Sequence, residues 1–129
     1  MPAPRSCRRR DKLYLADIVE AADAVATFLA GAERDRFLQD DLLRSAVLQK
    51  LSIIGEAAAR LSKEFRAHHA DVGWRDIVAF RNIAVHAYFA VQWSIVWTTA
   101  TQDVPALHQK ISQILAAEFP DDAPPKSLF

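Results

Sequence analysis

Apolar residues recur every three or four positions through four stretches of the chain, which is the period of an amphipathic α-helix. The predicted helices cover about residues 11–30, 40–66, 74–85 and 91–119. Their apolar stripes are Tyr14, Ile18, Ala21, Val25 and Phe28; Leu43, Val47, Leu51, Ile54, Ala58, Leu61 and Phe65; Ile77, Phe80 and Ala84; and Trp93, Trp97, Ala100, Val104, Leu107, Ile111 and Ile114. Gly31 is expected to end the first helix, and Asp40 or Gln39 to cap the second.

The second predicted helix carries a second apolar line beside its main stripe, made of Leu42, Ala46, Ile53 and Ala57. This surface is wider than one neighbouring helix covers, which indicates that part of it meets another subunit. Gly55 costs the helix about 1 kcal/mol relative to Ala and predicts the close approach of another helix. Glu56 follows directly, either as a solvated or salt-bridged charge or as part of a site.

The fourth predicted helix contains Pro105, which removes a backbone hydrogen bond and normally kinks or breaks a helix. Because its apolar stripe keeps its phase across the proline, one long kinked helix is favoured. A break with Asp103 capping a fifth helix is the alternative.

These elements predict an all-α fold, an up-and-down bundle of four main helices with the last kinked or split near Pro105. The helical domain is expected to span residues 11–119. Residues 1–10, rich in Pro and Arg, and residues 120–129, which hold three of the six prolines, are expected to be disordered tails.

Composition narrows the class of protein. The chain has 129 residues, 51% of them apolar, and only three glycines. With 16 basic and 16 acidic side chains the formal charge is zero, so any RNA contact must come from a local patch. The lone Cys7 excludes a disulfide framework, and no run is apolar enough for a membrane helix or a signal peptide. We therefore expect a cytoplasmic protein. Adjacent His68 and His69 lack a nearby ligand in sequence, so no metal site is predicted there.

The candidate chemistry lies in the apolar run that begins at Phe80, where Arg81, Asn82, His86 and Tyr88 stand out. Histidine suits proton transfer near neutral pH, and the guanidinium fork of arginine matches phosphate oxygens. Together they could cleave RNA without a metal: the 2′-hydroxyl attacks the adjacent phosphate, His86 moves a proton, and Arg81 stabilises the transition state. On residue chemistry alone, however, an Arg and a His at a helix end are more often structural.

The spacing of Arg81 and His86 constrains how they could act together. Five helical steps leave them about 140° apart around an ideal helix. Either His86 bends back from the helix end, or two copies of the chain meet across a two-fold axis. The second arrangement is favoured because it places two copies of both residues in one groove.

The run Arg81-Asn82-Ile83-Ala84-Val85-His86-Ala87-Tyr88 resembles the R-x4-H-x-Y motif of the HEPN superfamily, and most closely the HepT-type ribonuclease toxins paired with minimal nucleotidyltransferase antitoxins. The similarity covers about residues 11–117. Its other segments include Tyr14-Leu15-Ala16-Asp17-Ile18, Ile54-Gly55-Glu56-Ala57-Ala58 with Arg60-Leu61, Trp74-Arg75-Asp76-Ile77, Tyr88-Phe89-Ala90-Val91, Ile95-Val96-Trp97 and Asp103-Val104-Pro105-Ala106-Leu107. Gln92 and Gly73 depart from the pattern, where an acidic residue and a proline are common, and neither lies in the motif.

The resemblance implies a toxin of a toxin–antitoxin system, an endoribonuclease that needs neither metal nor cofactor. Arg81 and His86 would be its catalytic pair, with Asn82 beside them, and Tyr88 would accept AMP from the nucleotidyltransferase, which silences the toxin. It further implies a homodimer with the cleft at its interface, and it raises transfer RNA as the RNA that is cut. The alternatives are a non-catalytic helical subunit that docks a nucleotidyltransferase, and a structural bundle without a site.

Overall fold

The computed structural model describes residues 5–86 and 92–120, with the side chains of residues 7–82 and 92–120. Its helices are α1 (Arg5–Leu29), α2 (Arg34–Gln39), α3 (Asp41–Arg60), α4 (Lys63–His68), the 3₁₀ turn η1 (Ala70–Val72), α5 (Trp74–His86), α6 (Trp93–Thr98), the π-helical turn η2 (Thr99–Asp103) and α7 (Val104–Glu118). No strand occurs among the described residues. The predicted all-α fold is confirmed.

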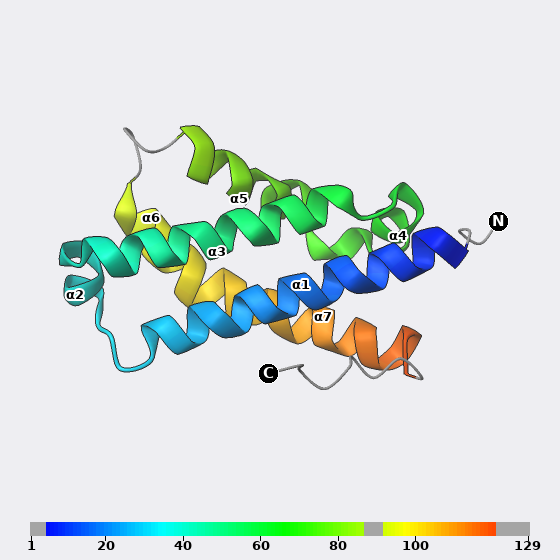
Figure 1. The fold of residues 1–129 in the computed structure, drawn as a ribbon, viewed down its shortest axis with the longest axis horizontal. Helices are drawn as coiled ribbons and strands as arrows, with labels where there is room; N and C mark the ends of the chain where they lie inside the picture. The colour runs from blue at the N-terminus through cyan, green and yellow to red at the C-terminus, as the bar shows by residue number, and fades with distance from the viewer. Residues whose placement is uncertain (1–4, 87–91, 121–129) are drawn as a thin grey trace.

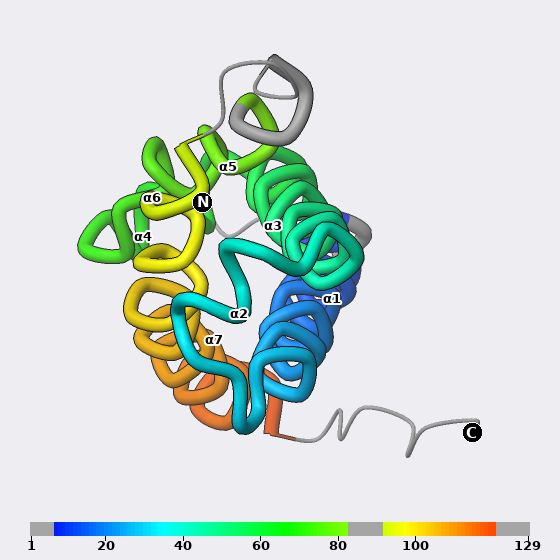
Figure 2. Tube along the Cα trace, turned by 90° about the vertical axis from the view of Figure 1, so that its left-hand side faces the viewer, coloured from blue at the N-terminus to red at the C-terminus, as the bar shows by residue number. Residues whose placement is uncertain are grey.

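The long helices run in alternating directions along the long axis of the molecule, which is horizontal in Figure 1. The helix α3 packs between α1 and α5, and α1 also packs against α7. Seen along the bundle, the helices surround a central core (Figure 2). That core is built from the predicted stripes, with Ile18, Leu51, Ile54 and Ile111 fully buried. Within the described residues, no helix is both long and apolar enough to cross a membrane.

Two predicted helix boundaries are confirmed by their backbone geometry. Gly31 follows α1 with a φ of 73°, a left-handed conformation that a residue without Cβ adopts at little cost. Asp40 precedes α3, and its side chain accepts a hydrogen bond from the backbone N–H of Leu43 at 3.0 Å. These local signals fixed where α1 ends and α3 begins.

The expected start of the first helix was wrong. The helix α1 begins at Arg5, so residues 5–10, expected in a disordered tail, are helical. Arg8 accounts for the extension: its guanidinium donates to the backbone carbonyl of Glu118 and lies 4.5 Å from the centre of the Phe119 ring. These contacts with the end of α7 could not be read from local composition. Residues 1–4 and 121–129 lie outside the described residues.

The second predicted helix is in fact two helices, α3 and α4, separated at Leu61 and Ser62. The Ser62 hydroxyl accepts from the backbone N–H of Phe65, capping α4. The buried carboxylate of Asp11 in turn accepts from the Ser62 backbone N–H and hydroxyl, at 2.8 and 2.7 Å. Leu61 and Phe65 remain buried across the break, so the apolar period concealed it.

The short helix α2 was not predicted. It places Phe37 fully inside the core, where its ring lies 6.4 Å from Trp93 and 5.3 Å from Trp97, measured between ring centres. One buried aromatic in six residues leaves no apolar period to detect.

The chain stays helical from Trp93 to Glu118, with the π-helical turn η2 ending two residues before Pro105. Asp103 has helical backbone angles and its side chain makes no cap hydrogen bond, which argues against a separate capped helix. In a π turn the backbone hydrogen bonds span five residues instead of four. This change of pattern lets the helix continue past Pro105, which has no backbone N–H to donate. One long helix with a local irregularity is the arrangement that the surviving stripe predicted.

Candidate functional site

Arg81 lies where α5 crosses α3, and Gly55 makes that crossing possible. A Cβ at position 55 would lie 2.5 Å from the Arg81 backbone nitrogen and 3.1 Å from the Ile77 carbonyl oxygen. Both neighbours are backbone atoms, which cannot swing aside. The predicted close approach of another helix at Gly55 is therefore confirmed, and it fixes the backbone of Arg81 against α3.

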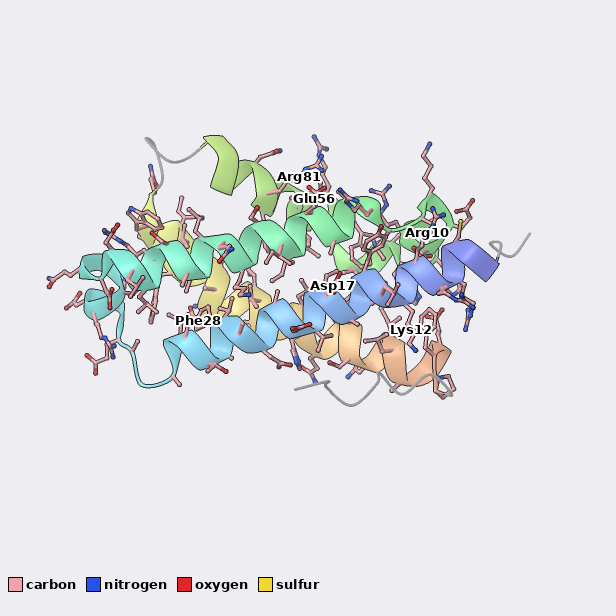
Figure 3. The ribbon with its side chains drawn as sticks, in the orientation of Figure 1. Arg10, Lys12, Asp17, Phe28, Glu56 and Arg81 are labelled. Atoms are coloured by element: carbon pink, nitrogen blue, oxygen red, sulfur yellow. The ribbon has the colours of Figure 1, made fainter. Side chains whose placement is uncertain are left out.

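The Arg81 side chain projects from this crossing towards Glu56, the residue after Gly55. Its Nη1 lies 3.4 Å from Glu56 Oε2, and the Arg81 side chain keeps 41% of its surface exposed. Figure 3 shows the two side chains together on one edge of the molecule, from α5 and α3. The contact is longer than a strong charge-assisted hydrogen bond, so it orients the guanidinium and leaves its other N–H groups able to bind a ligand.

Glu56 also accepts a hydrogen bond from Arg60 Nε at 3.0 Å, so one carboxylate serves two guanidinium groups. The bond from Arg60, and secondarily the bond from Arg81, holds the pKa of Glu56 below its ordinary value. Hydrogen bonds to the Glu56 and Tyr14 side chains raise the pKa of Arg60. A polar network thus runs from α5 across α3 to α1, with Glu56 negatively charged at its centre.

The remaining motif residues are placed to different extents. Asn82 is exposed on α5, directly after Arg81. His86 is the last residue of α5, so the helix does not end between Arg81 and His86. The positions therefore keep the separation of about 140° around the helix that was expected from the sequence. The His86 side chain and the whole of Tyr88 lie outside the described residues.

A known protein family matches the part of the chain that contains Gly55, Glu56 and Arg81. The family model for HepT-like ribonucleases, "Ribonuclease HepT-like", matches residues 18–114, from α1 through the Gly55 crossing and Arg81 to α7. The chain belongs to the HepT-like ribonuclease family. The resemblance that the motif indicated is thereby confirmed.

Individual relatives agree with the HepT-like assignment. "Putative RNase MJ1380" of Methanocaldococcus jannaschii is 33% identical over 104 residues, covering 81% of this chain and 95% of the relative. "Putative RNase TTE0752" of Caldanaerobacter subterraneus subsp. tengcongensis is 34% identical, covering 81% and 94%. "Probable ribonuclease HepT" of Thermococcus cleftensis is 34% identical, covering 83% and 97%. No solved structure matches the chain.

A second group of titratable side chains forms where α4 and α7 end. His68, His69 and Glu118 each place one potential ligand atom within 4.8 Å of the others. The sequence places no carboxylate beside the two histidines, and folding brings Glu118 to them from the end of α7. His69 Nε2 lies 2.5 Å from Glu118 Oε2, although the contact is not aligned as a hydrogen bond. Three ligands are one fewer than a structural zinc site has, and the contact joins the residue after α4 to the last residue of α7.

Sequence reasoning left the role of Glu56 open, and the structure shows its contact with Arg81. The signal in the sequence was its position directly after Gly55. A residue beside a helix crossing is brought close to the neighbouring helix, whatever its own chemistry. The sequence did not show that Arg81 is the residue that lies opposite Glu56 on the neighbouring helix.

Proposed function

We propose that this protein is the toxin of a toxin–antitoxin system and an endoribonuclease that cuts RNA without a metal ion. The observation that carries the proposal is the half-exposed guanidinium of Arg81, fixed at the Gly55 crossing and oriented by Glu56 in a HepT-like chain. A fixed, permanently charged fork is suited to stabilise negative charge on a phosphate during cleavage.

The proposed reaction uses the substrate's own nucleophile. The 2′-hydroxyl oxygen bonds to the adjacent phosphorus while the bond to the 5′-oxygen breaks, leaving a 2′,3′-cyclic phosphate and a 5′-hydroxyl. His86 moves a proton, Arg81 stabilises the charge on phosphate oxygens, and Asn82 offers a hydrogen-bonding group beside them. RNA is the substrate, with transfer RNA as the first candidate, and DNA is not cut because it lacks the 2′-hydroxyl.

The active form in this proposal is a homodimer whose active site is completed by the second copy. Because α5 continues through His86, Arg81 and His86 of one chain do not face a common point on the helix. Part of the apolar surface of α3 also stays uncovered in the single chain: Leu42 is 81% exposed and Ile53, one turn before Glu56, is 37% exposed. A second copy packed on this face of α3 would cover Leu42 at the start of the helix and Ile53 near Glu56.

Regulation in this proposal acts on Tyr88. A minimal nucleotidyltransferase antitoxin transfers AMP from ATP to the Tyr88 hydroxyl, which releases pyrophosphate. The added phosphate is an anion attached within the same sequence motif as Arg81, and in this proposal it competes with the RNA phosphate for that guanidinium.

The decisive experiment is cleavage of RNA by the purified protein in the presence of EDTA. We expect cleavage of RNA but not of DNA, and we expect His86→Ala to abolish it with the helical content and oligomeric state unchanged, because a general acid–base group contributes about 10² to 10⁴ in rate. Cleavage that survives His86→Ala, or that EDTA removes, contradicts the proposal. Absence of all cleavage by the unaltered protein, with retained binding of a nucleotidyltransferase, would favour the alternative, a non-catalytic docking subunit.

The regulatory part has its own measurement. Incubation with the cognate nucleotidyltransferase and ATP should raise the intact mass of the protein by whole AMP units, and Tyr88→Phe should prevent the increase. An increase that persists in Tyr88→Phe would place the modification on another residue.

A further inference from the structure

An open hollow of about 540 Å³ lies between α4 and α5. Its apolar lining consists of Ala67, Trp74 and Val78, and its polar lining of Lys63, Arg66 and Arg75. We call it the basic hollow. Trp74 is 7% exposed, and its indole N–H donates a 2.9 Å hydrogen bond to the His69 carbonyl oxygen. Trp74 thus builds the wall, and the polar groups offered to a ligand are the three cationic side chains.

The charge of the basic hollow is one-sided. Its lining contains three cations and no carboxylate. Lys63 and Arg75 are exposed and Arg66 is half-buried. Within the part of the chain that the structure describes, none of the three forms an ion pair. In a chain of zero net charge, this is a local basic patch of the kind that could contact RNA.

The excess of positive charge is found on one side of α5 and not on the side that faces α7. A cavity of about 250 Å³ between α5 and α7 is lined by Asp76 and Asp103 together with Lys110. Carboxylates there disfavour an anionic ligand. Of these two hollows along α5, only the one next to α4 has the charge to hold phosphate groups.

The basic hollow and the candidate active site lie along the same helix, α5. Val78 lies three and four residues before Arg81 and Asn82, the spacing of neighbours on a helix surface. From Arg75 to the end of α5 at residue 86 the helix rises about 16 Å, which at most about five stacked nucleotides would span. A strand held at residues 81–86 therefore reaches the hollow within a few phosphates.

We propose that the basic hollow is a phosphate-binding subsite that holds the RNA strand a few nucleotides from the bond being cut. This inference rests on the proposed function, because it assigns the same substrate to a second site. Lys63, Arg66 and Arg75 contact backbone phosphates, so the subsite adds affinity and sets the position of the strand without reading its bases.

The test measures binding separately from cleavage, with a fluorescent single-stranded RNA whose 2′-hydroxyls are all methylated so that it cannot be cut through them. Binding is followed by anisotropy over a series of salt concentrations. We expect Arg75→Gln and the double variant K63Q/R66Q to weaken binding and to lower the slope of log affinity against log salt by about 0.7 for each phosphate that the variant no longer neutralises. Lys110→Gln, on the α7 side of α5, is the matched control and should leave the slope unchanged.

Cleavage kinetics give a second readout. For a long RNA, Arg75→Gln should raise KM and leave kcat unchanged, because the subsite binds substrate and transition state alike. A dinucleotide is too short to reach the hollow, so the Arg75→Gln variant and the unaltered protein should cleave it at the same rate. The subsite is overturned if the Arg75→Gln and K63Q/R66Q variants show the same salt slope as Lys110→Gln. It is also overturned if these variants keep RNA binding but bind a nucleotidyltransferase more weakly, because the hollow would then be a protein-docking surface. Normal, hollow-dependent RNA binding without cleavage would instead overturn the proposed ribonuclease and leave the subsite standing.

Discussion

At the scale of single residues, the contact between Glu56 and Arg81 links the sequence motif to the rest of the fold. Arg81 is always charged, so its usefulness depends on where its guanidinium is held. Glu56 holds it from the neighbouring helix by a 3.4 Å contact, while a shorter bond connects Glu56 to Arg60. Glu56 is therefore a positioning residue in the proposed mechanism, acting through Arg81.

We predict that Glu56→Gln lowers the rate of RNA cleavage up to about fivefold, because exposed ion pairs orient their partners only weakly. The pKa of Glu56 is depressed in the folded chain, so its contribution is present above its ordinary pKa of 4.5 and is lost as the pH falls through the lower, folded value. The rate profiles of Glu56→Gln and the unaltered protein should therefore run parallel between about pH 5 and 8 and converge only below that range.

Arg60→Gln is the control for this prediction, because Arg60 contacts Glu56 but has no contact with Arg81 among the described residues. It should affect cleavage less than Glu56→Gln does. A change in the shape of the profile near neutral pH in Glu56→Gln would mean that Glu56 itself transfers a proton.

At the scale of helices, the crossing of α3 and α5 sets the site. The backbone of Arg81 is in contact with the position where a Gly55 side chain would begin. The missing Cβ lets two helix backbones approach, at a cost to α3 of about 1 kcal/mol in helix propensity. A crossing of this kind transmits any change at residue 55 directly to Arg81.

We predict that Gly55→Ala destabilises the fold despite the better helix propensity of alanine. Overpacking typically costs about 1–3 kcal/mol, and here the clash is with backbone, so the free energy of unfolding should fall by about 1 kcal/mol or more in urea unfolding. Cleavage should fall as well, because α5 must shift and carry Arg81 with it. Ser45→Ala, at an exposed position of the same helix, is the control and should be neutral or slightly stabilising. A net stabilisation by Gly55→Ala would show that the helices separate freely.

At the scale of the whole molecule, the question is how many chains complete one site. The helix α5 carries both Arg81 and His86 but on different sides, and α3 leaves Leu42 and Ile53 exposed in the single chain. These observations support a site in which one copy supplies Arg81 and its partner supplies His86.

We predict complementation between two inactive variants, Arg81→Gln and His86→Ala, when they are unfolded together and refolded as a mixture. In a mixed dimer with shared sites, one of the two sites keeps both residues, so the mixture should regain about a quarter of the unaltered activity, since half of the dimers are mixed. Each variant refolded alone serves as the control. If both residues of a site came from the same chain, the mixture would stay inactive.

The sequence alone determined those features that depend on near neighbours along the chain. The 3.6-residue period predicted the buried faces of the long helices, and Gly31 and Asp40 predicted their boundaries. Gly55 predicted a close helix approach, and the run from Arg81 to Tyr88 indicated the ribonuclease family. Each of these signals lies within a few turns of one helix, where geometry follows directly from residue type and spacing.

The tertiary structure decided which distant residues meet. Glu56 and Arg81 are 25 residues apart, and Asp11 and Ser62 are 51 apart. Glu118 reaches His69 from the end of α7, and Lys63 and Arg66 join Arg75 only because α4 packs beside α5. No local period encodes these pairings, because they depend on how helices cross and on where the chain between them breaks. The network around Arg81 and the basic hollow therefore became visible only in the folded molecule.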